Sequence, residues 1–313
     1  MALPIHARFT RPGKLPPAAA LPGRVAVLDL AFDGADPERD LRWAAALGPR
    51  LAVWIDHHDQ PCWERVASDP RFVLVPRALA PACPPLVTRE RVRRFGPVDA
   101  VLAHGDLDGV LSAAKWTLLQ LELPVPHWLD PDGIAADTRR GSLTPRGQRL
   151  DHALRGGGDR DGVRRAVVAS VLAEARGAQE PEEVARRLDS AARAHARARG
   201  AAERAAAAAI PLADIPENAA VVDLRRFPSD QRVDVTAMML ALQQRYDWVI
   251  VLGRQSGGGL KILVSTYPER TGLDLRREFN LQGFAPFRVH VAAEALLRRL
   301  PSADLQHVLG TVG

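Results

Sequence analysis

The chain has 313 residues, of which 47% are hydrophobic and 25% charged, the composition of an ordinary globular protein with room for two domains. No apolar run approaches the roughly 20 residues of a membrane-spanning helix, and the Pro-rich residues 1–23 lack the apolar core of a secretory signal. The net charge is +5, but 39 of the 42 basic residues are arginines, as in proteins from GC-rich genomes, so the charge favours a polyanionic partner only slightly. The two cysteines form neither a disulfide framework nor a zinc motif. We therefore expect a cytoplasmic protein with no membrane partner.

Short apolar runs alternate with helical patterns in the first half of the chain. We expect strands at 24–30, 50–56, 71–76 and 98–104, and helices at 38–47, 86–95 and 110–121. Strands that alternate with helices indicate βαβ units, so the predicted fold class is α/β, with a mostly parallel sheet and helices on both faces.

The composition changes twice farther along the chain. Residues 139–210 are rich in Ala and Arg and carry helix formers almost throughout, which predicts a helical connector. From about residue 218, strand and helix patterns return and predict a second, smaller α/β domain. The expected segments are a Pro-rich arm at 1–23, a first domain at 24–150, the connector at 151–215 and a second domain at 216–313.

Acidic clusters directly follow three of the expected strands. The clusters are Asp29, Asp56-His57-His58, and Asp106 with Asp108. Ligands of parallel α/β sheets bind beyond the carboxyl ends of the strands, so these side chains are expected to meet. Crowded carboxylates repel one another, and divalent cations relieve the repulsion. Carboxylates with imidazoles and no thiolate suit Mn²⁺ or Mg²⁺, and there are enough ligands for two ions, the usual equipment for hydrolysing phosphate esters.

The turn His104–Gly109, with the sequence HGDLDG, fits this chemistry. Asp106 and Asp108 are two residues apart and can face one pocket from an extended turn. Gly109 allows a close approach of the backbone just before a helix, whose N-terminus favours a phosphate anion.

The DHH sequence at 56–58, taken together with H-x-D-x-D-G at 104–109, resembles the motifs of the DHH phosphoesterase superfamily. That superfamily includes RecJ-type exonucleases, oligoribonuclease-like and cyclic-dinucleotide phosphodiesterases, exopolyphosphatases and family II pyrophosphatases. In the family, D-x-D precedes DHH, whereas here it follows, so the motif order looks circularly permuted. A permutation preserves a site if the strands still lie side by side, because geometry and not sequence order fixes metal ligation.

The resemblance implies a set of metal ligands. Asp106 and Asp108 match two metal-binding aspartates, and His57 matches the metal-binding histidine. Asp29 matches the aspartate that bridges the two ions. For the family's fourth aspartate the candidate is Asp137 in a segment similar to the family's own, and Asp130 and Asp132 compete with it.

Four neighbouring residues receive other roles. His58 matches the histidine that meets the substrate phosphate, and Asp56 would orient the two histidines. His104 would add a ligand or line the pocket. Asp59 is expected to be a loop or capping residue.

The second domain resembles the family's DHH-associated C-terminal domain, in which a Gly-rich GGGH loop grips the substrate. No such tetrad occurs here. The residues expected to bind substrate in its place are Gly258, Gly259, Lys261, Gly283, Arg288 and His290. The SGGGLK sequence at 256–261 fits equally well a hairpin turn between two strands.

The leading hypothesis is a phosphoesterase that uses two Mn²⁺ ions, with Mg²⁺ as the alternative. Its partner would be a nucleotide or short single-stranded nucleic acid, namely a short oligonucleotide, a single-stranded end or a cyclic dinucleotide, and a homodimer is a candidate assembly. Two alternatives stay open: a pyrophosphatase or polyphosphatase with the same site, and a non-catalytic DHH-fold protein that binds nucleic acid or nucleotide.

Overall fold

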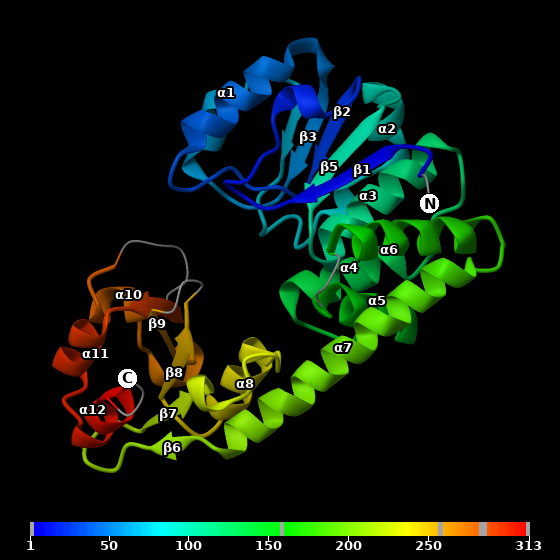
Figure 1. The fold of residues 1–313 in the computed structure, drawn as a ribbon. Coiled ribbons are helices and arrows are strands. Elements are labelled where there is room, and N and C mark those ends of the chain that lie inside the picture. The colour runs from blue at the N-terminus through cyan, green and yellow to red at the C-terminus, as the bar shows by residue number, and fades with distance from the viewer. Residues whose placement is uncertain (1–2, 157–159, 256–258, 282–286, 311–313) are drawn as a thin grey trace. The chain divides into compact units, whose positions relative to one another are not determined.

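The computed structural model describes residues 3–156, 160–255, 259–281 and 287–310. The chain divides into two compact units, Met1–His195 and Ala196–Gly313 (Figure 1). Each unit is built on its own five-stranded sheet covered by helices, so the fold is α/β, as the alternating strands and helices predict. No helix in these four stretches is both long enough and apolar enough to cross a membrane.

The sheet of the first unit contains five parallel strands in the order β1-β5-β2-β3-β4. The strands are β1 His6–Thr10, β2 Val25–Leu28, β3 Leu51–Asp56, β4 Phe72–Leu74 and β5 Ala100–His104. Every residue of β2 and β3 is buried, which explains their nearly continuous apolar sequences, because a parallel sheet is covered on both faces.

Helices cover both faces of this sheet (Figure 1). On one face α1 packs over Trp54, whose ring stacks on Phe32 with a centroid distance of 4.6 Å. On the other face α3 and α6 share a core with Val53 and Ile55. The helices of this unit are α1 Pro37–Leu47, α2 Arg89–Phe95, α3 Leu107–Gln120, α4 Leu129–Thr138, α5 Pro145–Arg155 and α6 Arg160–Ala175, and α7 Glu182–Ala207 continues into the second unit. Short 3-10 turns lie at Ala18–Ala20, Gly48–Arg50, Pro61–Val66, Pro84–Leu86 and, in the second unit, Leu224–Arg226.

The helix α3 is buried on nearly all sides and carries a buried cation, Lys115. Its Nζ donates to both carboxylate oxygens of Asp130 at 2.7 Å and to the carbonyl of Pro84 at 2.9 Å. A buried ammonium needs such partners, because an unpaired charge away from water is costly. The contact fastens α4 to α3 and so helps to place the side chains that α4 presents.

The N-terminal segment differs from the expected Pro-rich arm at 1–23. His6–Thr10 form the edge strand β1, which pairs in parallel with β5. Ile5, Ala7 and Phe9 are buried, and the residues between them are more exposed, so the segment has the alternation of a strand. The prolines on either side hide this five-residue pattern in the sequence.

The expected connector at 151–215 also differs from the structure. Leu188 and Ala191 lie in the same core as α3 and the first sheet, so residues up to His195 belong to the first unit. From Ala196 onward α7 belongs to the second unit, where Ala202 and Ala205 pack against the second sheet. The boundary between the units therefore falls inside one continuous helix.

The second unit is built on a mixed sheet in the order β10-β9-β8-β7-β6, in which only the pair β7–β8 is parallel among the described strands. The strands are β6 Ile210–Pro211, β7 Ala219–Asp223, β8 Trp248–Arg254, β9 Leu260–Ser265 and β10 Arg288–Val291. The helices are α8 Val235–Leu242, α9 Pro268–Thr271, α10 Leu275–Glu278, α11 Ala293–Arg299 and α12 Ala303–Gly310. One face of the sheet packs against α10, α11 and α12, and the other against α8 and the end of α7.

If β1 is an integral strand, Phe9→Ala should be strongly destabilising. The side chain is only 6% exposed, and removing a buried phenyl ring typically costs about 3–5 kcal/mol. Urea denaturation followed by circular dichroism measures the free energy of unfolding. His6→Ala, on the exposed face of the same strand, is the matched control and should cost less than about 1 kcal/mol. Equal, small effects of both substitutions would mean that the segment is a loose arm.

Candidate metal centre

The three acidic clusters meet at one edge of the first sheet. β2 lies between β5 and β3, and Leu28 is paired with Ala103 on one side and with Ile55 on the other. The residues that follow these positions, Asp29, His104 and Asp56, therefore leave the sheet side by side. The HGDLDG sequence, which comes last in the chain, stands next to Asp29 because β5 is inserted beside β2.

The contacts within the cluster are short. His57 Nε2 lies 3.2 Å from Asp29 Oδ1 and 3.8 Å from Asp108 Oδ2. His104 Nδ1 lies 2.8 Å from Asp106 Oδ1 and 3.9 Å from the other oxygen of Asp29. The two oxygens of Asp29 thus face two different histidines, which places this carboxylate at the centre of the cluster.

Three overlapping sets of side chains in the described part of the chain have donor atoms close enough to hold an ion. Within each set the atoms lie within 4.8 Å of one another. The sets are Asp29 with His57 and His58, Asp29 with His104 and Asp106, and His57 with Asp108 and Asp137. Asp29 and His57 each belong to two sets, so neighbouring ions would share ligands.

The buried donor atoms at this centre lack hydrogen-bond partners among the described residues. They are both oxygens of Asp29, Nε2 of His57 and Oδ2 of Asp108. Buried polar atoms are nearly always paired, because leaving one unpaired costs about 1–3 kcal/mol. All four atoms are oxygen or imidazole nitrogen, the ligand types that suit a divalent cation.

The protonation of His57 supports the same conclusion. Its Nδ1 lies 3.1 Å from the carbonyl oxygen of Ala80, which can only accept, so Nδ1 carries the hydrogen. Burial lowers the pKa of His57, against the attraction of Asp137 and Asp56, so the ring is neutral and Nε2 has a bare lone pair. That lone pair lies 3.2 Å from Asp29 Oδ1, so the contact is favourable when the Asp29 carboxyl carries a proton or when a cation lies between the two groups. This is the tautomer of a metal-ligating histidine whose other nitrogen is anchored.

Burial and mutual repulsion act on the carboxylates. The pKa of Asp29 is raised well above its usual range by burial first and then by the charges of Asp106 and Asp56. The pKa of Asp108 is raised for the same reasons, burial and then the charge of Asp29. Asp106 differs: burial raises its pKa, but the hydrogen bond and charge of His104, together with further hydrogen bonds from Asp108 and the main chain, outweigh burial and lower the pKa. Without a cation, therefore, Asp29 and Asp108 resist ionisation together.

The backbone is adapted to this crowding at two residues. Asp29 has φ = 55°, in the left-handed region that non-glycine residues seldom adopt, and its N–H donates to Ile55 O at 2.8 Å. A Cβ at Gly109 would lie 2.7 Å from His104 O and 2.9 Å from Asp29 Oδ2. Position 109 therefore has room only for glycine, which lets the first turn of α3 lie against the carboxylate.

Asp56 orients His58 but does not touch His57. His58 Nδ1 lies 2.8 Å from Asp56 Oδ1, and the Asp56 side chain is fully buried. The ring of His58 remains 32% exposed, with Nε2 as its open nitrogen. The expectation that Asp56 orients both histidines is thus too broad, because the main-chain carbonyl of Ala80 holds His57 instead.

Among the three candidates for the fourth aspartate, only Asp137 lies at the centre. Asp130 is bonded to Lys115, and buried Asp132 accepts hydrogen bonds from the N–H and the hydroxyl of Thr144 at 2.9 and 2.6 Å. Asp137, at the other end of α4, has its carboxylate within reach of His57 and Asp108.

Arg77 is a residue of the centre that the sequence pattern does not reveal. Its guanidinium forms an ion pair with Asp137, and its main-chain N–H donates to Asp59 Oδ2 at 2.9 Å. Asp59 is therefore a loop residue whose carboxylate holds the turn that begins at Arg77. The loop that carries Arg77 also supplies the Ala80 carbonyl that holds His57, so it closes one side of the centre. A single arginine in a Pro-rich loop gives no signal of this position.

A cavity of about 280 Å³ opens beside the metal ligands. Its lining includes both acidic and basic side chains, namely Asp106, Asp108, Asp137, Asp151, Arg139 and Arg155. Arg155 is paired with Asp151 at 2.7 Å, whereas Arg139 makes no ion pair with any residue that the structure describes. The cavity therefore combines the carboxylates with cationic side chains, which suits a ligand whose phosphate lies between metal ions and arginines.

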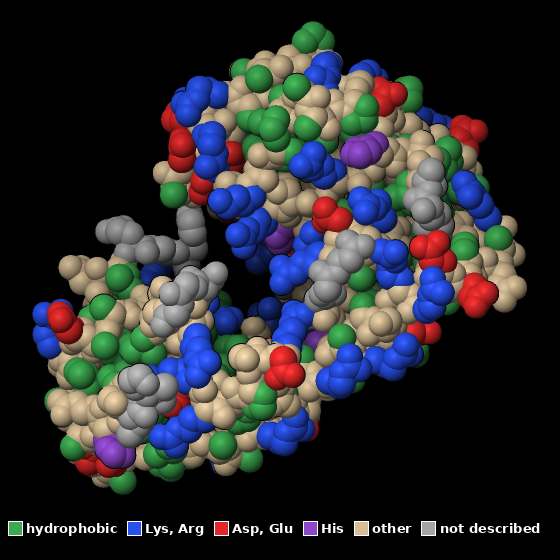
Figure 2. Space-filling model, in the orientation of Figure 1, with side chains coloured by type: hydrophobic (Ala, Val, Ile, Leu, Met, Phe, Trp, Pro, Cys, Tyr) green, Lys and Arg blue, Asp and Glu red, His purple; other side chains and the backbone are tan. Residues whose placement is uncertain are grey.

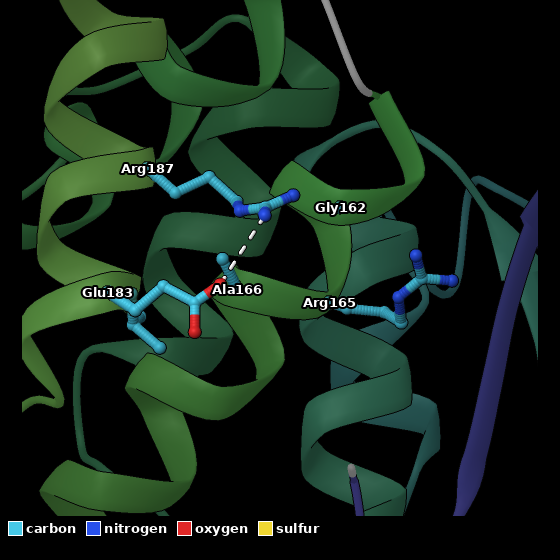
Figure 3. A pocket seen from close by; sticks show the side chains of 6 residues that line it. Gly162, Arg165, Ala166, Glu183 and Arg187 are labelled. Carbon is cyan, nitrogen blue, oxygen red and sulfur yellow. Dashed lines mark ion pairs between the residues drawn. The ribbon is translucent and has the colours of Figure 1, made fainter. Parts of the chain in front are cut away.

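A second cavity in the first unit, of about 260 Å³, lies between α6 and α7 (Figure 3). Arg165, Glu183 and Arg187 line it, and Glu183 is already paired with Arg187 at 3.5 Å. One paired carboxylate does not make a metal site. Figure 2 shows the many Arg and Lys side chains spread over the visible face of both units, so basic charge alone marks no site.

The substrate-binding residues expected in the second domain fall in the second unit. Gly258 and Gly283 lie outside the described residues. Lys261 and Arg288 line a common cavity, to which Gly259 and His290 do not contribute. β8 and β9 pair antiparallel, with Arg254 opposite Leu260, and Leu260 and Lys261 of the SGGGLK sequence belong to β9. Residues 256–258 of that sequence lie outside the described residues.

The fold and the centre together define an α/β protein in which carboxylates and imidazoles that could hold a metal ion gather at the carboxyl edge of a parallel sheet. No protein-family model matches the chain, and a comparison with curated proteins finds no match either. Among solved structures, the chain is similar to a pGpG-specific phosphodiesterase, PggH from Vibrio cholerae, with 12% sequence identity and a TM-score of 0.42. The similarity covers 92% of this chain and 99% of that chain. At this identity and score it carries no argument about activity, which must rest on the centre itself.

Asp108→Asn should stabilise the metal-free protein at neutral pH and abolish its stabilisation by Mn²⁺. The pKa of Asp108 is raised on folding, so this carboxyl contributes stability below its unfolded pKa of about 3.9 and loses that contribution as the pH rises through the folded value. The advantage of the neutral amide should therefore shrink as the pH falls. For the wild type, Mn²⁺ at a hundredfold excess over its Kd should raise the free energy of unfolding by about 2.7 kcal/mol. Thermal unfolding with EDTA and with Mn²⁺ measures both effects.

Asp274→Asn is a control of opposite sign. Hydrogen bonds from Arg276 lower the pKa of Asp274 to about 2, so its contribution is present above the unfolded pKa and lost as the pH falls. This substitution should lower stability at neutral pH and leave the response to Mn²⁺ intact. Destabilisation of the metal-free protein by Asp108→Asn would contradict the repulsion described above.

Arg77→Met should strengthen Mn²⁺ binding. The substitution removes a cation next to the centre and frees Asp137, and a partly exposed charge interaction of about 1 kcal/mol corresponds to about fivefold in Kd. Isothermal titration calorimetry measures the Kd. Arg65→Met is the matched control, because Arg65 is similarly exposed but is paired with Glu38 away from the centre. Weaker binding in Arg77→Met would show instead that Arg77 holds Asp137 in its ligating position.

Proposed function

We propose that the chain is a two-metal phosphoesterase that hydrolyses phosphodiester bonds in a small nucleotide substrate, with Mn²⁺ as its ion. One observation carries the proposal. The buried oxygens of Asp29 face two histidines without hydrogen-bond partners among the described residues, at the point shared by two sets of metal-ligand atoms. One carboxylate between two ion positions is the arrangement that two-metal hydrolysis of phosphate esters requires.

Two groups of residues would hold the ions. Asp108, Asp137 and His57 form one group, and Asp106 and His104 form the other. Asp29 is close to both groups and would bridge them. When bound, the ions neutralise charge on the phosphate and lower the pKa of a bound water.

The protein itself orients the reacting groups. Asp56 holds the Nδ1–H of His58, which leaves Nε2 directed away from Asp56 and able to contact a phosphate oxygen. The Ala80 carbonyl fixes the tautomer of His57, so that this ring offers a lone pair and no proton. Gly109 keeps the N-terminal turn of α3 close to Asp29. The main-chain N–H groups at the start of this helix would therefore lie beside a bound substrate phosphate.

The cavity supports a small substrate. About 280 Å³ is at the lower end of the roughly 300–1,000 Å³ of small-molecule sites, too little for a duplex. Arg139 lines the same cavity as the carboxylates and offers a guanidinium with no ion pair among the described residues. Bidentate contact with a phosphate is the interaction that this group makes best.

Release of mononucleotides tests the proposal. The full chain is incubated with Mn²⁺ and either pGpG, a cyclic dinucleotide, a short RNA or pyrophosphate, and the products are separated by ion-exchange chromatography. We expect turnover of the phosphodiesters, and a loss of at least about 10²-fold in kcat for Asp108→Asn and for His58→Ala. Asp69→Asn, which changes an aspartate paired with Arg71 away from the centre, is the control and should retain full activity.

Three results would contradict the proposal. Turnover in EDTA equal to that in Mn²⁺ would exclude a metal-dependent reaction. Turnover of pyrophosphate alone would favour the anhydride reaction. Bound Mn²⁺ with no turnover of any substrate would assign the chain to non-catalytic binding.

A further inference from the structure

The turn between β5 and α3 contains two glycines, and the reasons for them differ. Gly109 is required by the close approach of α3 to the metal ligands, as described above. Gly105 lies between His104 and Asp106, and its φ is not positive, so its backbone conformation does not require glycine. A Cβ at position 105 would instead collide with Nη2 and Cζ of Arg164 and would lie 2.6 Å from Nε. The missing side chain thus lets the guanidinium of Arg164 lie against the backbone of the turn.

Arg164, in α6, is held by three contacts. Its Nε donates to the carbonyl oxygen of Gly105 at 3.0 Å, and its Nη1 pairs with Asp161 Oδ1 at 3.1 Å. The guanidinium also lies over the ring of Phe9 in β1, with Cζ 6.0 Å from the ring centroid. The side chain is only 18% exposed. Because three neighbours fix the planar guanidinium, it is a rigid donor to the turn.

The hydrogen bond to Gly105 O determines the orientation of the next peptide group. The peptide between Gly105 and Asp106 is trans and planar, so its C=O and its N–H point in opposite directions. With the carbonyl directed to Arg164, the N–H of Asp106 is directed to the other side of the turn. The main-chain N–H at Asp106 is one of the groups that lower the pKa of the Asp106 carboxyl. Arg164 therefore acts on Asp106 through one rigid peptide group.

Asp106 depends on this support because few other contacts fix it. It is the N-cap residue of α3, but its side chain makes no capping hydrogen bond to the described first turn and is 51% exposed. Asp108, by contrast, lies within that first turn, and its side chain is 3% exposed. The set of metal ligands that contains His104 and Asp106 therefore depends on the conformation of the turn, whereas the set that contains Asp108 depends on α3 itself.

We propose that Arg164 is a positioning residue of the metal centre. It fixes the peptide between Gly105 and Asp106 and thereby keeps Asp106 and His104 in place for one of the two ions. This role deepens the two-metal function proposed above and rests on it. Arg164 is not among the described residues that line the cavity beside the metal ligands, so it acts through the turn and not on the substrate.

The sign of the effect on metal affinity separates positioning from charge. A cation near the centre weakens the binding of a metal ion, so the removal of a charge that acts only at a distance strengthens binding, as expected for Arg77→Met. Removal of a positioning residue has the opposite effect. Groups that orient metal ligands typically contribute about 10–100-fold to metal affinity.

Binding of Mn²⁺ to the full chain tests the proposal without any turnover. Wild type and Arg164→Met are freed of metal and titrated with Mn²⁺ in a calorimeter, and electron paramagnetic resonance follows the bound ions. We expect the wild type to bind two ions and to give the exchange-coupled spectrum of a bridged pair. In Arg164→Met one ion should bind as in the wild type and the other about 10–100-fold more weakly, with an uncoupled spectrum at the same Mn²⁺ concentration. Thermal unfolding checks that the variant is folded.

Further variants locate the effect in the contact between Arg164 and Gly105. Gly105→Ala keeps the arginine, but the added methyl group displaces the guanidinium, so binding of the same ion should weaken. The double variant should lose no more affinity than either single variant, because both changes break one contact. Arg165→Met is the matched control, because Arg165 is the next residue of α6 and lines the cavity between α6 and α7 (Figure 3). This variant should bind both ions as the wild type does.

Several outcomes overturn the role of Arg164 and leave the proposed hydrolysis untouched. These are equal or tighter binding of both ions in Arg164→Met, equal weakening of both ions, or fully additive losses in the double variant. A wild type that binds fewer than two Mn²⁺ ions would contradict both proposals. A wild type that binds two ions and hydrolyses no substrate would contradict the hydrolysis alone, because the titration measures only binding.

Discussion

The repulsion among carboxylates at one edge of the parallel sheet is the constraint on which the first unit depends. Asp29 and Asp108 are buried within a few ångströms of one neutral histidine, and burial and mutual charge raise the pKa of both. Asp29 also has a left-handed backbone. These features oppose folding of the metal-free chain, and the hydrophobic cores on the two faces of the sheet offset them. A site with this much unfavourable charge is stable when a cation completes it.

The supports around the centre are arranged so that the ligands cannot relax away from one another. Lys115 fastens α4 to α3 through Asp130, and Thr144 holds Asp132, so the C-terminal end of α4 keeps Asp137 at the centre. Gly109 keeps α3 against Asp29. Relaxation of any of these would reduce the repulsion and also the ability to bind a cation, so rigidity here costs stability in the metal-free chain and favours binding.

Much of the centre could be predicted from the sequence because its residues follow apolar strands directly. Ionisable side chains at the end of an apolar strand are unfavourable unless they act together, and this applies to Asp29, His57 and Asp108. A parallel sheet brings such positions to one edge. The choice among Asp130, Asp132 and Asp137 could not be made, because all three lie on one helix and their partners, Lys115 and Thr144, are known only from the packing. The strand at His6–Thr10 was hidden by flanking prolines, and the boundary near His195 lies inside a helix with no break in its sequence. Arg77 acts through a contact between a loop and a helix, for which no local pattern exists.

The main-chain carbonyl of Ala80 contributes to the centre without depending on a functional side chain. It determines which nitrogen of His57 is bare, yet it belongs to the backbone, while the buried side chain of Ala80 contributes only to packing. A substitution scan of side chains would therefore overlook the contact. The chemistry of the centre thus depends partly on groups that no sequence comparison can see.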